Sequence, residues 1–304
     1  MTKAQQSGYM GTEDCENSEI TPVDFQRIAV IAHADAGITL EDSKRSLVYS
    51  RLIRRLRHLS LRNFTEYCDL VSGANGAEER AQMIAALMTH TTRFFREEHH
   101  YKFLVETVLP PLIDAARRGD RVRLWSAGCS SGEEVYSLMF CLLQLCPEVA
   151  TLDIRILASD IEKNVLRKAK SGVYLAHAVQ KLNPTIVETF FDPAEVSQDQ
   201  RQVKEDVRRL ISFRELNLNG VWPVQGLFDV VFCRNVAIYF DAKVQDRLWQ
   251  SFARAIRPGG YLFIGHSERL SASVKDRFDM NAMTTYRLRK GDQSDGAVAF
   301  IQGT

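Results

Sequence analysis

One segment constrains the fold of this chain more than any other: an apolar run stops at a glycine-bearing loop, and an amphipathic stretch follows directly. The segment spans residues 122–137 and reads VRLWSAGCSSGEEVYS. A strand, a glycine loop and a helix in this order form the opening unit of a nucleotide-binding α/β sheet. The sequence therefore predicts a doubly wound α/β domain.

The glycine loop also indicates which ligand it suits. It is not a P-loop, because no Gly-Lys-Ser/Thr follows, and its glycines are spaced G-x-x-x-G instead of the dinucleotide pattern G-x-G-x-x-G. The acidic pair Glu133-Glu134 lies where a phosphate would need positive potential. The loop thus favours an adenosine-type ligand without phosphates, such as S-adenosylmethionine. A tight turn between a packed strand and helix explains the same residues about equally well.

Further strands follow along the chain. They are predicted at residues 152–158, 210–216, 227–233 and 261–265, with a last strand or hairpin at 278–288. Asp160 follows the second strand, where doubly wound folds hold ribose hydroxyls; a helix N-cap is the competing role, and the position favours ribose binding. Arg234 and Asn235 follow the strand 227–233, at the edge where such sheets bind ligands.

The other segments define the domain organisation. Residues 21–88 predict a small all-helical domain, 89–119 a linker and helix, and 120–290 the α/β domain. Residues 193–209 interrupt the α/β rhythm and indicate a surface insertion that contains a short antiparallel hairpin. The polar residues 1–20 predict a disordered lead-in, and residues 291–304 a tail.

Composition narrows the functional classes. The 304 residues carry a formal net charge of +1, so nothing global points to nucleic acid, and we expect no such partner. The six cysteines are scattered without a metal-ligand spacing, and we expect no metal site. The N-terminus lacks the apolar core of a signal peptide, and no apolar run approaches membrane-spanning length. These features favour the reducing cytoplasm, without direct membrane insertion.

Positive charge is concentrated in the helix predicted at residues 44–59. Arg51, Arg54 and Arg55 lie on the face opposite the apolar residues, and residues 44–58 hold one lysine, five arginines and no acid. Most basic faces are merely solvated. The lack of acidic partners in a nearly neutral protein nevertheless favours an acidic binding partner. Duplex nucleic acid fits less well, because neither interleaved aromatic residues nor a second basic patch supports it.

Six motifs, taken in order, resemble a known family. They are TTRFFRE, WSAGCSSGEEVYS, LASDI, LNL, FDVVFCRNVAIYFD and FIGHSE. The chain resembles the CheR family, the S-adenosylmethionine-dependent methyltransferases that esterify glutamates of bacterial chemoreceptors. The resemblance implies a class I methyltransferase domain, an N-terminal helical domain and a small β subdomain inserted at about residues 190–212. It also implies S-adenosyl-L-methionine as cofactor and the cytoplasmic domain of chemoreceptors as partner, and we expect a monomer.

The same resemblance implies the site residues. Cofactor contacts fall on Thr92, Arg96, Glu133, Asp160, Asn217, Leu218, Arg234 and Asn235, with His90 at a position where some relatives have asparagine. Tyr239 matches a family tyrosine close to the reacting methyl, and Arg96 and Tyr239 are assigned to catalysis. Arg51, Arg54 and Arg55 are assigned to docking along the receptor's glutamate-rich helices.

The implied reaction suits these residues. A glutamate side chain has a reference pKa of about 4.3, so it is ionised at neutral pH and needs no general base. The sequence offers no obvious Ser-His-Asp or Cys-His set that would supply one. Because carboxylate and sulfonium charges cancel along the reaction, we expect catalysis to rest on a dry pocket and on positioning.

Two other functions stay open on the sequence. A methyltransferase of the same fold could act on a different acceptor, nucleic acid or a small molecule, although the Asn/Asp-Pro-Pro-aromatic signature of amino-group methylation is absent. A non-catalytic cofactor-sensing module is the other alternative, and the presence of both Arg96 and Tyr239 argues against it.

Overall fold

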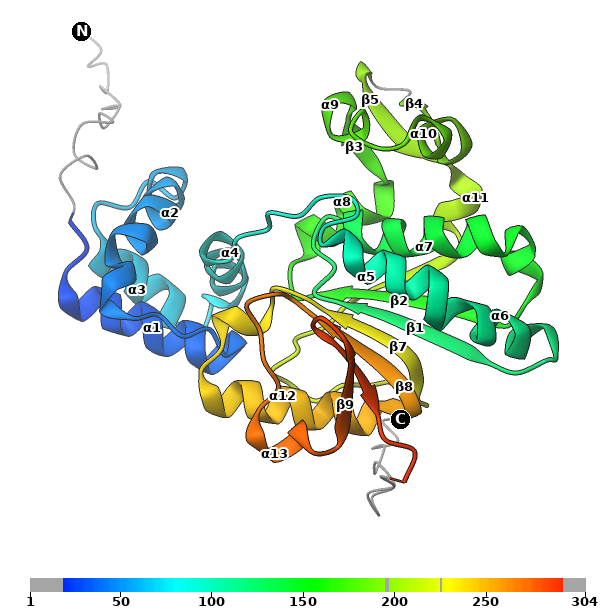
Figure 1. The fold of residues 1–304 in the computed structure, drawn as a ribbon. Coiled ribbons are helices and arrows are strands. Elements are labelled where there is room, and N and C mark those ends of the chain that lie inside the picture. The colour runs from blue at the N-terminus through cyan, green and yellow to red at the C-terminus, as the bar shows by residue number, and fades with distance from the viewer. Residues whose placement is uncertain (1–18, 195–196, 225, 292–304) are drawn as a thin grey trace, which may run out of the picture. The chain divides into compact units, whose positions relative to one another are not determined.

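The structure of this protein is a computed structural model that describes residues 19–194, 197–224 and 226–291 (Figure 1). The chain divides into two compact units, Met1–Thr89 and His90–Thr304, and each is described here by itself. The predicted lead-in at 1–20 and tail at 291–304 lie almost entirely outside the described residues.

The first unit contains the helices α1 (Pro22–Ala36), α2 (Arg45–His58), α3 (Phe64–Ser72) and α4 (Ala77–Leu87), with a 3₁₀ turn, η1 (Asp42–Lys44), before α2. The start of α1 follows from its sequence: the Thr21 side chain accepts the Asp24 N–H at 3.1 Å, and Pro22 occupies the first turn. Gly37 ends α1 in the left-handed conformation, with φ 74°.

The second unit is built on a seven-stranded sheet in the order β6-β2-β1-β7-β8-β10-β9. The first five strands in this order are parallel: β6 (Ile211–Glu215), β2 (Ile154–Asp160), β1 (Val122–Ala127), β7 (Phe228–Cys233) and β8 (Ile256–Ile264). The hairpin strands β9 (Phe278–Ala282) and β10 (Thr285–Leu288) complete the sheet, with β10 antiparallel to β8. Strand β8 begins earlier than the predicted 261–265, because an irregular register next to β7 absorbs the Pro258-Gly259-Gly260 segment.

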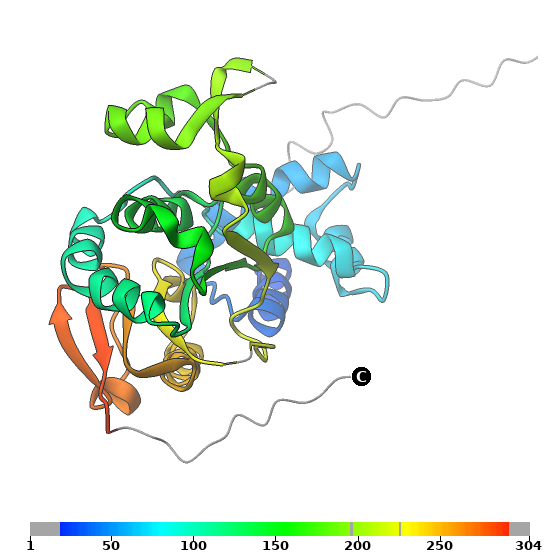
Figure 2. The same cartoon turned by 90° about the vertical axis from the view of Figure 1, so that its right-hand side faces the viewer.

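Helices cover both faces of this sheet (Figures 1 and 2). Leu124 of β1 packs in one core cluster with Leu138 of α7 (Glu133–Leu145), and the next residue, Trp125, packs in the other cluster with Trp249 of α12 (Ala242–Ala255). This alternation follows from the two-residue period of a strand. The covering elements are α5 (Glu98–Phe103), the π-helical η2 (Leu104–Val108), α6 (Leu109–Arg117), α7 (Glu133–Leu145), η3 (Pro147–Thr151), α8 (Lys163–Ser171), η4 (Ala237–Tyr239), α12 (Ala242–Ala255) and α13 (Ala272–Lys275).

A smaller antiparallel sheet is inserted between α8 and β6. Its strands are β3 (Val173–Leu175), β5 (Ser197–Val203) and β4 (Phe191–Ala194), in that order, with α9 (Ala176–Val179), α10 (Pro184–Phe190) and α11 (Glu205–Arg208) beside them. The β subdomain is thus larger than the predicted hairpin, because β3 precedes it in the chain. Phe190 stacks on Phe140 of α7 with ring centroids 4.7 Å apart, which attaches this subdomain to the main domain.

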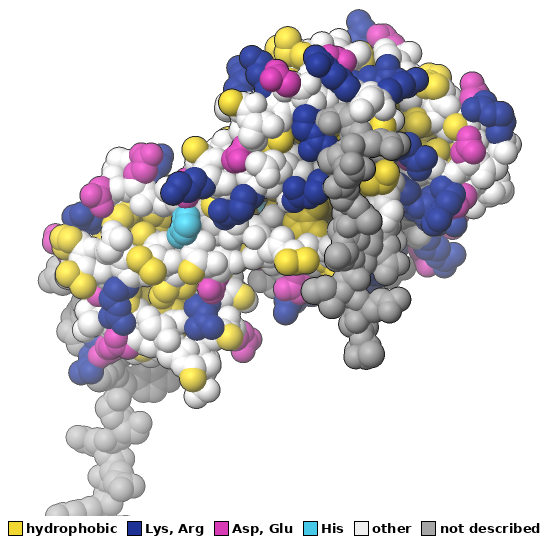
Figure 3. All heavy atoms as spheres, turned by 90° about the horizontal axis from the view of Figure 1, so that it is seen from below, with side chains coloured by type: hydrophobic (Ala, Val, Ile, Leu, Met, Phe, Trp, Pro, Cys, Tyr) yellow, Lys and Arg dark blue, Asp and Glu magenta, His cyan; other side chains and the backbone are white. Residues whose placement is uncertain are grey.

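On the face seen in Figure 3, lysine and arginine side chains lie among acidic and apolar ones. In the part of the chain that the structure describes, no helix combines the length and the apolar character needed to span a membrane.

Candidate cofactor and active site

The carboxyl ends of the five parallel strands meet at one edge of the sheet. From β1 the chain moves outward to β2 and β6 and then returns to β7 on the other side of β1. Doubly wound sheets bind ligands at such a switch point. Asp160 ends β2, Asn217 and Leu218 follow β6, and Arg234 and Asn235 follow β7, so the topology brings these predicted residues to the same edge.

The glycine loop between β1 and α7 is shaped by the protein's own packing. Gly128 and Gly132 have φ values of 79° and 97°, which few side-chain-bearing residues adopt. A Cβ on Gly128 would overlap the side chain of Val236, and one on Gly132 would lie 2.9 Å from the Tyr174 hydroxyl and from the Ala169 Cβ. The geometry therefore supports the tight-turn interpretation of these glycines.

Asp160 is 5% exposed and fixes the loop from the end of β2. Its carboxylate accepts the Ser130 N–H at 2.8 Å and the Glu162 N–H at 3.1 Å. Burial raises its pKa, and these two hydrogen bonds oppose the rise. The N-cap of α8 is Glu162, so Asp160 does not occupy the alternative N-cap position.

The acidic pair at the start of α7 divides its contacts. Glu133 accepts a hydrogen bond from the Ser131 hydroxyl at 2.6 Å, and Glu134 accepts one from the Ser126 hydroxyl at 2.8 Å. Both carboxylates stabilise the positive end of the helix dipole. Residues 128–132 contain no lysine or arginine that could bind phosphate. Two carboxylates and no basic side chain suit an adenosyl group and a sulfonium better than a nucleotide phosphate.

The segment 90–97 reaches the same edge of the sheet. His90 pairs with Glu162 at 2.8 Å, and its carbonyl accepts the Ser130 hydroxyl at 3.3 Å. This contact with His90 lowers the pKa of Glu162. Arg96 is partly exposed and donates to the Thr91 carbonyl at 2.9 Å. Thr92, between them, is half-buried.

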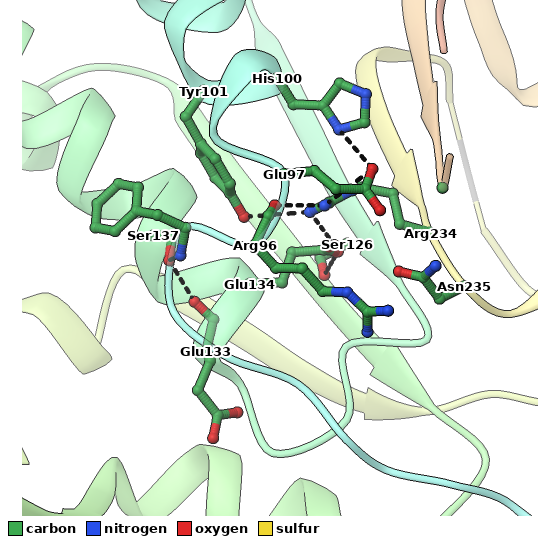
Figure 4. A network of polar contacts seen from close by, with 12 residues as sticks. Arg96, Glu97, His100, Tyr101, Ser126, Glu133, Glu134, Ser137, Arg234 and Asn235 are labelled. Atoms are coloured by element: carbon green, nitrogen blue, oxygen red, sulfur yellow. Dashed lines mark hydrogen bonds and ion pairs between the residues drawn. The ribbon is translucent and has the colours of Figure 1, made fainter. Parts of the chain in front are cut away.

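The side chain of Arg234 is 1% exposed, which is unusual burial for an arginine. Its guanidinium lies 3.1 Å from the Glu134 carboxylate and 3.3 Å from that of Glu97 (Figure 4). Burial alone would lower the pKa of Arg234, but Glu134, Tyr101 and Glu97 raise it. The guanidinium therefore faces the protein interior.

Sequence reasoning missed the contribution of Glu268, which comes from the loop after β8 and is 4% exposed. One carboxylate oxygen accepts N–H groups from Asn235 at 2.9 Å and Gly265 at 2.6 Å, and the other accepts them from Val236 at 2.9 Å and Ala237 at 2.7 Å. Burial raises the pKa of Glu268, and these backbone hydrogen bonds oppose the rise. Only its place in the motif FIGHSE, just after a strand, could have indicated this residue.

The loops at both sides of this edge carry the last predicted residues. Asn235 has φ 60°, and Tyr239, in η4, is half-buried next to Ile238, which is 49% exposed. After β6, Asn217 accepts the Asn219 N–H at 2.9 Å, and the Leu218 carbonyl accepts the Trp222 indole N–H at 3.2 Å. The Trp222 ring in turn lies edge-on to Trp125, with centroids 5.0 Å apart.

In the first unit, α2 presents the basic face that the sequence predicts. Arg55 pairs with Glu79 of α4, at 3.0 Å between Nε and Oε1, and Arg51 donates to the Leu87 carbonyl and the Thr89 hydroxyl. Arg54 is exposed. The acidic partner that α2 lacks in its own sequence is thus supplied to Arg55 by a neighbouring helix.

Family models match both units. Residues 90–287 match the CheR methyltransferase, SAM binding domain, and residues 23–88 match the CheR methyltransferase, all-alpha domain. Together with the sheet order and a glycine loop that has no basic side chain for phosphate, these matches define an S-adenosylmethionine-dependent methyltransferase of class I. The chain belongs to the CheR methyltransferase family, so the predicted fold class, enzyme class and cofactor are confirmed.

Named relatives cover nearly the whole chain. It is 48% identical over 256 residues to a probable chemotaxis protein methyltransferase of Rhizobium etli, covering 84% of this chain and 96% of that protein. It is 36% identical over 279 residues to the chemotaxis protein methyltransferase of Escherichia coli, covering 90% and 94%. The chemotaxis protein methyltransferase of Klebsiella aerogenes is 35% identical over 291 residues, covering 95% and 97%.

Proposed function

We propose that this methyltransferase esterifies glutamate side chains in the cytoplasmic domain of bacterial chemoreceptors. The observation that supports this most directly is the match of both units to CheR domains, together with chemotaxis methyltransferases that are similar over most of the chain. We further propose that the enzyme acts in the cytoplasm as a monomer, and that the methyl esters it forms serve sensory adaptation.

We assign cofactor binding to residues at the carboxyl edge of the sheet. They are His90, Thr92, Arg96, Glu133, Asp160, Asn217, Leu218, Arg234 and Asn235. Bound S-adenosylmethionine supplies an electrophilic methyl group on a sulfonium. Because the Arg234 guanidinium is buried, its contribution to binding would come from its backbone at the end of β7. The Asp160 carboxylate keeps acceptor capacity beyond its two N–H partners, which suits ribose hydroxyls.

Arg96 and Tyr239 are the proposed catalytic residues. Arg96 has only one of its five N–H groups bonded to Thr91, so its guanidinium can orient an incoming carboxylate. The half-buried Tyr239 would line the path of the methyl group and exclude water. No proton has to be removed from an ionised carboxylate, so neither residue needs to act as a base.

We propose that Arg51, Arg54 and Arg55 of α2 form the docking surface for the acidic helices of the receptor. Arg54 presents its charge to solvent, whereas Arg51 and Arg55 are bonded to α4 and the residues after it. Long-range attraction to a glutamate-rich helix would therefore come mainly from Arg54.

Transfer of labelled methyl from S-adenosylmethionine to purified cytoplasmic receptor fragments tests this function. Base-labile label on receptor glutamates is the expected result, and Arg96→Ala should abolish it while circular dichroism and melting temperature stay unchanged. Normal turnover by Arg96→Ala would contradict the role of Arg96. Tight cofactor binding without transfer to any receptor would instead favour a different acceptor or a cofactor-sensing module.

A further inference from the structure

The buried guanidinium of Arg234 connects three separate segments of the site (Figure 4). It contacts Glu134 at the start of α7, at 3.1 Å, and Glu97 just before α5, at 3.3 Å. It also donates to the backbone carbonyl of Arg96, and its other contact is the Tyr101 hydroxyl at 3.5 Å. The end of β7 is thereby attached to the residue that we assign to catalysis.

The backbone around Arg96 is held in an unusual conformation. Phe95 and Glu97, on either side of Arg96, have φ values of 51° and 60°. Residues with a side chain seldom adopt such values, and they persist only where surrounding contacts hold them. Arg96 lies between these two residues, so the direction of its side chain depends on their unusual backbone conformation.

Different contacts hold each side of this segment. On the Phe95 side, the N–H donates to the Ser137 hydroxyl at 2.9 Å and the ring packs edge-on against Tyr101, with centroids 5.1 Å apart. On the Glu97 side, the carboxylate contacts Arg234 and the His266 ring, the latter at 3.1 Å. Arg234 is the contact shared by the Arg96 carbonyl and the Glu97 side chain, so its loss would release the conformation on that side.

Arg234 also supplies the positive charge that balances the Glu97 carboxylate. This carboxylate and the rings of His99 and His100 have ligand atoms within 4.8 Å of one another, an arrangement that could hold a metal ion. Arg234 already supplies a positive charge at 3.3 Å from this carboxylate. The Coulomb repulsion of a second buried cation so close by disfavours a metal there. Although burial would raise the pKa of Glu97, Arg234, His266 and His100 hold it below its ordinary value.

We propose that Arg234 is a positioning residue that aims Arg96 at the carboxylate of the substrate. The inference rests on the proposed catalytic role of Arg96. A guanidinium can serve the Arg96 carbonyl, Glu97 and Glu134 at once because its donors form a rigid planar fork. The ammonium of a lysine is a single point of charge and cannot span the same three acceptors.

The variant Arg234→Lys tests the proposal, because it keeps the charge and removes the fork. Positioning errors of about 1 Å lower turnover by about 100-fold. We expect a kcat loss of that order at saturating S-adenosylmethionine, where weaker cofactor binding cannot contribute to the loss. Arg287→Lys is the matched control: Arg287 donates to the Gly259 carbonyl at 3.0 Å from β10, away from the carboxyl edge, and this variant should keep wild-type kcat.

A double-mutant cycle separates positioning from a general structural role. In an Arg96→Lys background, Arg234→Lys should cost little further activity, since its effect is transmitted through Arg96. Fully multiplicative losses, or an unchanged kcat in Arg234→Lys, would overturn the proposal. If Arg234→Lys does not fold, Glu97→Gln serves instead, because it removes the ion pair that holds Arg234 beside this segment and keeps the pair with Glu134; an unchanged kcat in Glu97→Gln would then overturn the proposal.

The same series keeps the two hypotheses distinguishable. Normal turnover by Arg96→Ala contradicts the catalytic assignment itself. An inactive Arg96→Ala together with a fully active Arg234→Lys contradicts only the positioning role.

Discussion

The carboxylate of Glu268 lies 2.9 Å from the backbone nitrogen of Asn235. Glu268 belongs to the loop after β8, so this hydrogen bond connects that loop to the loop after β7. Three further backbone N–H groups, those of Gly265, Val236 and Ala237, share this carboxylate. A single buried carboxylate therefore accepts the backbone N–H groups of the turn that carries both Asn235 and Tyr239.

Glu268→Gln should destabilise the fold by about 3 kcal/mol or more, because the amide nitrogen cannot accept N–H groups and leaves buried donors unsatisfied. Urea denaturation measures the loss. Glu148→Gln, which breaks an exposed pair with Arg117, is the control and should cost far less stability, because solvent screens this pair. Equal effects of the two substitutions would show that the buried carboxylate has no special role.

Gly132→Ala should destabilise the protein by about 2–4 kcal/mol, because left-handed backbone strain adds to a clash with Ala169 and Tyr174. Gly119→Ala provides a close comparison, since Gly119 has φ 96° and nothing within 4 Å of an added Cβ. The difference between the two variants in denaturant unfolding isolates the packing contribution. If both lose the same stability, the packing at Gly132 is not limiting.

His100 should make the fold sensitive to acid. Burial, with help from Arg234 and His99, lowers its pKa from 6.5 to about 3, and its Nε2 lies 2.8 Å from the Thr284 hydroxyl. Between these two pH values the unfolded chain binds more protons than the folded one, so stability falls as pH falls from 6.5 towards 3.

The variant His100→Gln checks this pH dependence. It should flatten the dependence in that window by up to about 1.4 kcal/mol per pH unit. Denaturant unfolding between pH 7 and pH 4 gives the measurement, with His58→Gln, at the exposed end of α2, as the control. A variant whose stability varies with pH as steeply as the wild type would exclude His100 as the titrating group.

Arg54→Glu should weaken receptor methylation by raising KM for the receptor fragment several-fold at low salt, with little change at 0.5 M salt, because the attraction is screened there. Arg54 is the suitable position, since Arg55→Glu would also break the pair with Glu79 inside the unit. Arg121→Glu reverses an exposed charge of the second unit, just before β1, and should leave KM unchanged. A salt-independent KM in both wild type and Arg54→Glu would contradict electrostatic docking.

The strand ends were predictable because they depend on simple patterns. Apolar runs such as 227–233 mark buried strands, and polar residues directly after them, such as Asp160 and Asn235, must lie at the carboxyl edge. The sequence also predicted the doubly wound class and, by resemblance, the family. Positions along the chain were sufficient for these conclusions.

Side-chain directions were not predictable in the same way. Whether Arg234 points to a ligand or inward depends on Glu97 and Glu134, which are distant in sequence, and nothing local indicates that choice. The role of Glu268 depends on backbone N–H groups that no sequence pattern displays. Strand β3 was missed because three residues are too short to show a period.

The pairing of Trp125 with Trp222 gives the protein an intrinsic optical probe. Of its three tryptophans, Trp125 and Trp249 are fully buried, whereas Trp222 is partly exposed and bonded to the loop that carries Asn217 and Leu218. A displacement of this loop would change the solvation of one indole and its coupling to the other. Emission spectra should therefore follow events at this edge of the sheet without any attached dye.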